Sequence, residues 1–403
     1  MSPYSAPRNR GCTATAEETT QDKENRPTTP FENFYCRSMQ TNMSNLAQNI
    51  LSQADSLRAV LDWQRGSGRK SLLEAGALLG SGKPVLITGI GASRYASLPL
   101  EYDLCAHGIH TVGVEAGELL HFNYPAYRDS IVVIVSRSGE SIEITKLLQL
   151  LKGRQTIVGV TNEADGLLAK SADCSLLIGS RSDEMVAIQT YTGTLLTLYL
   201  LGAAIAQQFD AACATVRSLQ AQFSHTVTEN MDAVEEWDSF LSPQHPVYLL
   251  ARGPSCASVF EGALLFNEIA KATAVGQPAA SFRHGPAEVV DDAFRGILFA
   301  PQGPTQEILL SLGSDVIRFG GRISMIGSEK ELPGAHPIRK IPDMPSQLAP
   351  LFEIVPIQVA ALRMAQLRGI VPGSFRYTPQ VARDEASFGK RETVAEATRL
   401  ENA

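Results

Sequence analysis

Hydrophobic residues in the first half of this chain occur in short, nearly uninterrupted runs, and amphipathic stretches separate one run from the next. The runs span residues 85–88, 111–114, 131–135, 156–160 and 174–178, and each is followed by Gly, Ser, Asn or Asp. A strand that is covered on both faces is apolar throughout rather than alternating, so these runs predict a buried parallel sheet. A long helical run over residues 186–209 closes this half of the chain.

The same alternation of short apolar runs and amphipathic stretches occurs in the second half of the chain. Residues 247–255 repeat the pattern of residues 85–93, and further strand-like runs follow at residues 296–300, 316–319 and 323–326. A long apolar segment over residues 348–367 matches the helix that closes the first half. The sequence therefore predicts two tandem α/β domains, each a doubly wound parallel sheet, joined by a helical connector over residues 210–241.

The flanking segments differ from these domains. Residues 1–42 are rich in Pro, Thr, Asn, Arg and Glu without apolar periodicity, which predicts a disordered extension. Residues 43–80 place apolar side chains at helical spacing and predict a leading helical segment. We therefore expect four parts, which are the extension (1–42), a first domain (43–212), a second domain (213–371) and a C-terminal tail (372–403).

Composition and charge exclude several classes of protein. The chain has 403 residues, of which 44% are hydrophobic and 19% charged, and its formal net charge is −7. Such a charge argues against a nucleic-acid partner but not against a small anionic ligand. The six cysteines show no metal-like spacing, which indicates inert thiols in a reducing compartment. No signal-peptide or membrane-spanning pattern is found, so we expect a cytoplasmic protein without a membrane partner.

The most informative loop joins the run at 131–135 to the next helix. It carries Ser136, Ser138 and Ser141 around Gly139. At a strand-to-helix turn, small hydroxyl residues and glycine leave donors beside the positive end of the helix, which suits a phosphate group. The alternative is an ordinary helix cap, in which the serines satisfy only backbone amides. Three serines at the carboxyl end of a strand favour the phosphate cradle.

The turn after the first strand, around Gly89 and Ser93, would face the same crevice. It lacks the third glycine of a dinucleotide fingerprint, so Ser93 is a candidate phosphate or sugar ligand instead. In the second half, the loop at 301–306 has two prolines and no serine, and each proline removes an N–H donor. One phosphate site per chain is the natural expectation.

Candidate reactive groups lie in the second domain. Glu261 and Glu268 fall on one face of an otherwise apolar predicted helix, and His284 follows in an irregular segment. A carboxylate on a buried helix is either paired structurally or kept for proton transfer, with its pKa raised by poor solvation. The residues alone leave both interpretations open. Histidine is the commonest proton carrier near neutral pH.

These motifs resemble the SIS (sugar isomerase) domain proteins and the isomerase half of glucosamine-6-phosphate synthase, over residues 51–383. The resemblance rests on the segments at 89–93, 136–141, 184–190, 261–268 and 284–286. It implies flavodoxin-like domains, a homodimer and no cofactor or metal. It also implies site roles: the hydroxyls of Ser93, Ser136, Ser138, Ser141 and Thr190 bind a sugar phosphate. Glu268 would shuttle a proton between C1 and C2, and His284 would open the ring, donated across the dimer interface.

The sequence departs from that synthase in three places. Ser2 rather than a nucleophilic Cys follows Met1, and about forty residues precede the first domain. Leu265 stands where the synthase helix has a lysine. The tail lacks the synthase's lysine motif, for which Arg383 or Lys390 could substitute. These departures predict a chain that does not use glutamine by itself.

The sequence-based hypothesis is an aldose–ketose isomerase that removes or transfers the amino group of an amino sugar 6-phosphate. The enzymes it resembles include deaminases and deglycases of glycated amino acid 6-phosphates. The rival is a non-catalytic sugar-phosphate sensor, which would need the cradle but not Glu268 and His284.

Overall fold

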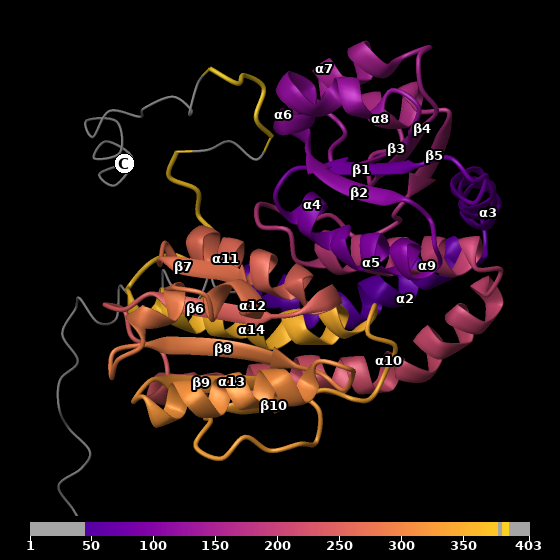
Figure 1. Ribbon diagram of the computed structural model, residues 1–403. Coiled ribbons are helices and arrows are strands. Elements are labelled where there is room, and N and C mark those ends of the chain that lie inside the picture. The colour runs from indigo at the N-terminus through magenta and orange to yellow at the C-terminus, as the bar shows by residue number, and fades with distance from the viewer. Residues whose placement is uncertain (1–44, 378–380, 387–403) are drawn as a thin grey trace, which may run out of the picture. The chain divides into compact units, whose positions relative to one another are not determined.

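The structure is a computed structural model that describes residues 45–377 and 381–386 (Figure 1). The expected disorder of residues 1–42 and the candidate Lys390 lie outside the described residues. The described residues fall within one compact unit that contains two parallel sheets of five strands each.

The first sheet has the strand order β2-β1-β3-β4-β5, and every pair is parallel. Its strands are β1 (Val85–Gly89), β2 (Thr111–Glu115), β3 (Ile131–Val135), β4 (Ile157–Thr161) and β5 (Cys174–Leu177). All residues of β1, β3 and β4 are buried, whereas the edge strand β2 is only partly buried. The uninterrupted apolar runs thus correspond to central strands covered on both faces.

The second sheet has the order β10-β9-β8-β6-β7 and is also parallel throughout. Its strands are β6 (Val247–Ala251), β7 (Ala274–Pro278), β8 (Arg295–Ala300), β9 (Arg322–Gly327) and β10 (Ile338–Lys340). Counted along the chain, this is the same order as in the first sheet, the flavodoxin-like one. The predicted fold class, two tandem doubly wound α/β domains, is confirmed.

Helices cover both sheets. Those of the first lobe are residues 45–51, α2 (Gln53–Arg65), α3 (Arg69–Leu79), α4 (Ala92–Ala96), α5 (Leu98–Ala106), α6 (Ala116–Glu118), α7 (Ile142–Leu151), α8 (Leu167–Ser171) and α9 (Gln189–Ile205), with short turns η1 (Leu119–Asn123) and η2 (Tyr124–Tyr127). The connector is α10 (Phe209–Asp232) and η3 (Val234–Ser239). The second lobe has η4 (Gly253–Ser255), α11 (Cys256–Ala270), α12 (Ala279–Phe282), η5 (Pro286–Val289), α13 (Gln306–Arg318) and α14 (Ala349–Leu367).

The strand expected at residues 316–319 is wrong. These residues belong to the end of α13 and the position after it. Leu309, Leu312 and Val316 are buried at helical spacing, and this period outweighs the β-branched character of the local run. The apolar runs also did not indicate β7 and β10, because β7 contains Gly, Gln and Pro and β10 has only three residues.

The two lobes share one hydrophobic core. Helix α9 of the first lobe packs against α2, α3 and α14, and α4 packs against α11 of the second lobe. Gln53 on α2 and Gln358 on α14 are both buried and exchange two hydrogen bonds, of 2.7 and 3.2 Å. These contacts hold the carboxyl end of β1 against the start of the second lobe. Among the described residues, no helix combines the length and apolar character needed to cross a bilayer.

Candidate active site

The serine-rich loop lies between β3 and α7, at the carboxyl edge of the first sheet. Gly139 within it has a φ of +66°, and a Cβ there would lie 2.8 Å from the Cβ of Leu168. Only glycine therefore fits the turn that reverses the chain into α7. The predicted position of the loop, beside the positive end of a helix, is the one observed.

The three serines of this loop take different roles in the structure. The Ser136 hydroxyl accepts the Gly139 amide at 3.1 Å, and the Ser138 hydroxyl accepts the Glu140 amide at 3.3 Å. Ser141 is the residue before α7, but its side chain makes no capping hydrogen bond. The loop is thus braced by two hydroxyl oxygens whose own hydrogens remain able to donate.

A cavity of about 390 Å³ opens beside this loop, between the two lobes. Its walls include four of the predicted hydroxyl residues and the predicted base, which are Ser93, Ser136, Ser138, Ser141 and Glu268. Ser93 comes from α4, and Glu268 comes from α11, which packs against α4. The fold therefore gathers residues from three separate segments of the sequence around one space.

Glu268 stands near the end of α11, on the second-lobe side of the cavity. Burial raises the pKa of its carboxyl to about 7, and the positive charges of Lys271 and Arg137 partly oppose that rise. A carboxyl with this pKa is part protonated and part ionised at neutral pH, which suits a group that both takes up and returns a proton.

Glu261, on the same helix, is only 1% exposed. Burial, and after it the charge of Glu268, raises the pKa of this carboxyl well above its ordinary value, which favours the protonated form. Its Oε2 atom has no hydrogen-bond partner among the described residues. Glu261 does not line the cavity.

Thr190 lies in the first turn of α9 and is 2% exposed. Its hydroxyl donates to the buried Asp183 carboxylate at 2.7 Å. The same carboxylate accepts the backbone amides of Ile188, Gln189 and Thr190 at 2.8–3.0 Å. Thr190 is not part of the cavity wall, and its hydroxyl helps to cap α9 instead.

His284 is exposed, between α12 and η5, after the edge strand β7. It does not line the cavity of its own chain. Within one chain His284 thus lies apart from the cavity that Glu268 lines, and its expected role across a dimer interface stays a prediction.

The matching positions of the second lobe are filled differently. Ser255 follows β6 as Ser93 follows β1, and its hydroxyl donates to Glu353 at 2.7 Å. Ser258 donates to the other oxygen of Glu353 at 2.6 Å. Burial raises the pKa of this fully buried carboxyl to about 7, against the lowering effect of the two serines. In the second lobe, the Glu353 carboxylate therefore accepts the hydrogen bond of the serine that corresponds to Ser93.

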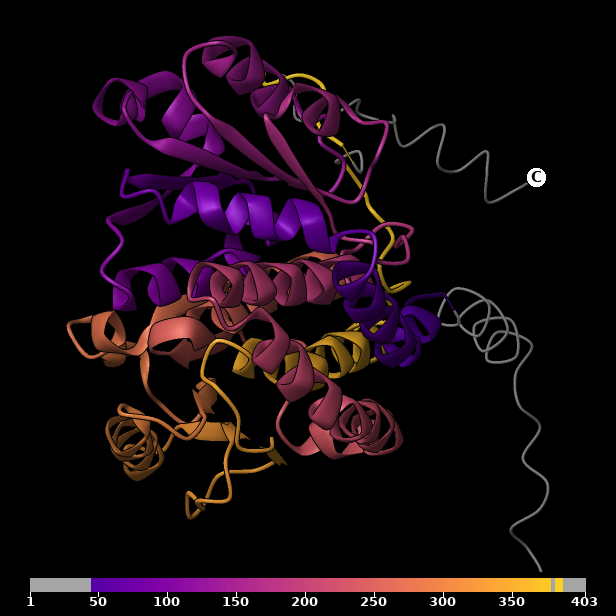
Figure 2. The same ribbon diagram turned by 90° about the vertical axis from the view of Figure 1, so that its right-hand side faces the viewer.

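The segment after α14 returns to the first lobe, and Figure 2 shows it in yellow beside the indigo and magenta elements. Phe375, Val381 and Ala382 line the cavity, and the Ala382 carbonyl accepts the Ile142 amide at 3.0 Å. Arg383 pairs with Glu140 of the serine loop at 3.2 Å. The tail therefore forms one wall of the site in this structure.

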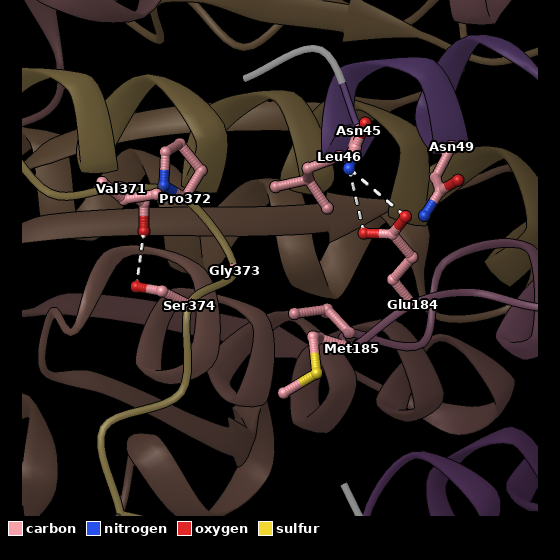
Figure 3. A pocket seen from close by; sticks show the side chains of 10 residues that line it. Asn45, Leu46, Asn49, Glu184, Met185, Val371, Pro372, Gly373 and Ser374 are labelled. Atoms are coloured by element: carbon pink, nitrogen blue, oxygen red, sulfur yellow. Dashed lines mark hydrogen bonds between the residues drawn. The ribbon is translucent and has the colours of Figure 1, made fainter. Parts of the chain in front are cut away.

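A second, smaller hollow of about 170 Å³ lies next to this cavity (Figure 3). Asn45 donates to both oxygens of Glu184, at 3.0 and 3.2 Å, and Ser374 donates to the Val371 carbonyl at 2.9 Å. Met185 lines both spaces. The flexible side chain of Met185 therefore belongs to the walls of both hollows.

Arg137, Glu143 and Met185 also line the cavity, although no motif in the sequence indicates them. Arg137 stands inside the serine loop, so its position was visible, but the spacing does not say whether its side chain points inward. Within the described residues, no cluster of three His, Cys, Asp or Glu side chains has the arrangement of a metal site.

Comparison with known protein families identifies a SIS domain at residues 78–206. Over 296 residues the chain is 28% identical to a glutamine–fructose-6-phosphate aminotransferase (isomerizing) from Pyrococcus horikoshii, covering 72% of this chain and 50% of that protein. The chain thus spans about half the length of the curated relatives it matches.

Solved structures share the fold. The C-terminal domain of the glucosamine-fructose-6-phosphate aminotransferase from Francisella tularensis superposes with a TM-score of 0.71 at 18% identity, covering 80% of this chain and 95% of that one. A glucosamine-6-phosphate deaminase from Thermotoga maritima gives a TM-score of 0.65 at 19% identity, covering 85% and 100%.

Proposed function

This chain is a SIS-domain protein homologous to the isomerase part of glutamine–fructose-6-phosphate aminotransferases, and on that premise we propose that it isomerises and deaminates an amino sugar 6-phosphate. One observation supports the proposal above the others. The serine loop of one lobe and the Glu268 carboxyl of the other line the same cavity, and burial raises the pKa of Glu268 to about 7.

In this account the phosphate binds at the amino end of α7. Ser136, Ser138 and Ser141 donate hydroxyl hydrogens to it, and Ser93 contacts the phosphate or the sugar. Donors at a helix terminus favour a dianion for both geometric and electrostatic reasons. The sugar chain then extends toward Glu268 on the opposite wall.

Glu268 takes the proton from C2 of the open-chain sugar and returns it to C1. The C2–H electron pair becomes the C1=C2 double bond of the intermediate. After protonation at C1 the nitrogen is held as an imine at C2, one water adds to that carbon, and ammonia leaves. The product is a ketose 6-phosphate.

We further propose a homodimer in which His284 serves the neighbouring site. His284 is exposed and absent from the cavity wall of its own chain, so a role in ring opening needs a second copy. Neither this step nor the proton transfer calls for a metal or cofactor in the proposed scheme.

A second candidate function is removal of an amino acid from a glycated amino acid 6-phosphate. The adjacent hollow favours it, because this space of about 170 Å³, which shares Met185 with the main cavity, gives room for a larger amine. The serine loop and Glu268 would have the same roles.

A panel of sugars tests the proposal. The protein is incubated with glucosamine 6-phosphate, fructose 6-phosphate plus ammonia, and fructosyl-lysine 6-phosphate, and ammonia, lysine and ketose phosphate are measured. Release of ammonia supports the deaminase, and release of lysine supports the second candidate. Binding without turnover of any sugar would favour a sugar-phosphate sensor.

A further inference from the structure

Proton abstraction next to a carbonyl creates a second requirement besides a base. As the C2–H pair moves into the C1=C2 bond, the carbonyl π pair moves onto O1, which becomes an oxyanion. In a site shielded from water, a fixed cation or hydrogen-bond donor at that oxygen is usually the largest source of rate enhancement.

The charged side chains that line the described cavity are few. They are Arg137, Glu143 and Glu268. The two carboxyl groups cannot stabilise an oxyanion when ionised. Arg137 is therefore the cation of this wall that is available for the task.

The backbone of Arg137 is held in place. Its carbonyl accepts the Thr161 hydroxyl at 3.0 Å and the Asn162 amide at 3.1 Å. Within the described parts of the chain, no hydrogen bond or ion pair occupies its guanidinium. A cation fixed at its base and unpaired at its tip is ready to bind a ligand oxygen.

Neighbouring cations are already engaged. The Lys271 ammonium donates to the carbonyls of Glu268 and Ser374, and Arg383 pairs with Glu140. Arg137 and Glu268 line the same cavity, and the charge of Arg137 opposes part of the rise that burial causes in the pKa of Glu268.

We propose that Arg137 is a catalytic residue whose guanidinium holds the O1 oxyanion of the enediolate or enolamine formed when Glu268 removes the C2 proton. Glu268 then returns that proton to C1. The nitrogen or oxygen substituent on C2 loses a proton to O1, so O1 becomes a neutral hydroxyl and no longer needs the charge of the guanidinium. This inference rests on the proposed function, because a sensor has no oxyanion to stabilise.

The test separates catalysis from phosphate binding. Arg137→Gln, Arg137→Lys and the control Arg128→Gln, an exposed arginine of the same lobe, are assayed for kcat and KM on whichever panel sugar the wild type turns over fastest. Calorimetry measures binding of glucitol 6-phosphate, which carries the phosphate but no carbonyl. The fold of each variant is checked by its melting temperature.

We expect Arg137→Gln to lower kcat by about 10²–10³-fold, the usual effect of losing an oxyanion donor, while the Kd for glucitol 6-phosphate stays close to that of the wild type. Arg137→Lys should retain part of the activity, and Arg128→Gln should behave as the wild type.

An unchanged kcat with a raised Kd for glucitol 6-phosphate would overturn the inference and make Arg137 a phosphate ligand. In that case wild-type turnover still upholds the proposed function. If the wild type turns over no sugar of the panel, the proposed function itself fails and this role fails with it.

Discussion

Glu261 and Glu268 lie seven residues apart on α11, and the charge of Glu268 adds to burial in raising the pKa of Glu261 well above its ordinary value. Burial raises the pKa of Glu268 to about 7, and the charges of Lys271 and Arg137 oppose part of that rise. The two carboxyl groups of this helix thus differ in setting: Glu261 is fully buried and favours its protonated form, whereas Glu268 lines the cavity and can ionise near neutral pH.

The first prediction concerns the pH dependence of catalysis. Only ionised Glu268 can accept a proton, so kcat/KM should rise with pH through a midpoint near 7. The measurement is the initial rate at low substrate between pH 5 and 9, with the melting temperature taken in the same buffers. An acid limb at the ordinary pKa of a glutamate would mean that Glu268 is not the base.

Glu261 gives a prediction about stability. Its carboxyl binds a proton more tightly in the folded chain than in the unfolded chain, where its pKa has the ordinary glutamate value of 4.5. Unfolding therefore releases a proton, and stability falls as pH rises. Glu261→Gln removes this dependence. The unfolding free energy of the variant relative to the wild type should therefore increase from pH 5 to pH 8.

The relative gain should grow at each step of pH across that range, because the unfolded chain loses this proton more readily than the folded chain does. Urea titrations at pH 5, 6.5 and 8 measure it. The comparison across pH is independent of any constant cost of placing an amide at this buried position. A difference that does not change with pH would show that Glu261 has an ordinary pKa.

The serine loop is tested by the double variant Ser136→Ala and Ser138→Ala. Each hydroxyl that donates to a charged group contributes about 1.5–3 kcal/mol, so affinity for glucosamine 6-phosphate should fall more than tenfold. The melting temperature should change little, and calorimetry provides the affinity.

Thr305→Ala is the matched control, because Thr305 lies in the equivalent loop of the second lobe and should leave binding unchanged. An unaltered affinity in the double variant would mean that the serines only brace the loop and cap its amides.

How much of this could be predicted from the sequence differs between fold and site. The buried central strands were readable because they are apolar on both faces, whereas β7 and β10 carry no such signal. The amphipathic period of α13 was mistaken for a strand at its β-branched end. Ser93, Ser136, Ser138 and Ser141 could be grouped because carboxyl ends of parallel strands meet at one edge.

Other site features depend on contacts that spacing does not encode. Thr190 was expected at the ligand, yet Asp183 takes its hydroxyl. His284, which the resemblance predicts to act across a dimer interface, is exposed on its own chain, and its role stays a prediction. Arg137 stands within the serine loop, so the sequence shows its position. The hydrogen bonds from Thr161 and Asn162 to its carbonyl, which fix its backbone, are visible only in the structure.

The expected dimer has its own test. Chains carrying Glu268→Gln are mixed under refolding or co-expression with chains carrying His284→Ala, and hybrids are isolated by two affinity tags. If His284 serves the neighbouring site, each hybrid dimer contains one intact site and should recover activity that both parents lack. Inactive hybrids in a verified mixed population would place both residues in one subunit's site or remove their roles.

The most direct test of the account is Glu268→Gln, measured in two ways on one preparation, with the exposed Glu229→Gln on α10 as control. Exchange of the C2 hydrogen of the substrate with solvent deuterium reports proton transfer, and calorimetry reports binding of the same sugar phosphate. We predict that exchange falls by about 10²–10⁴-fold, the usual contribution of a general base, while binding is retained. Exchange at the wild-type rate in Glu268→Gln would contradict the assignment of Glu268 as the proton carrier. If the wild type binds a sugar phosphate of the panel but exchanges the C2 hydrogen of none, the assignment as an isomerase is contradicted as well.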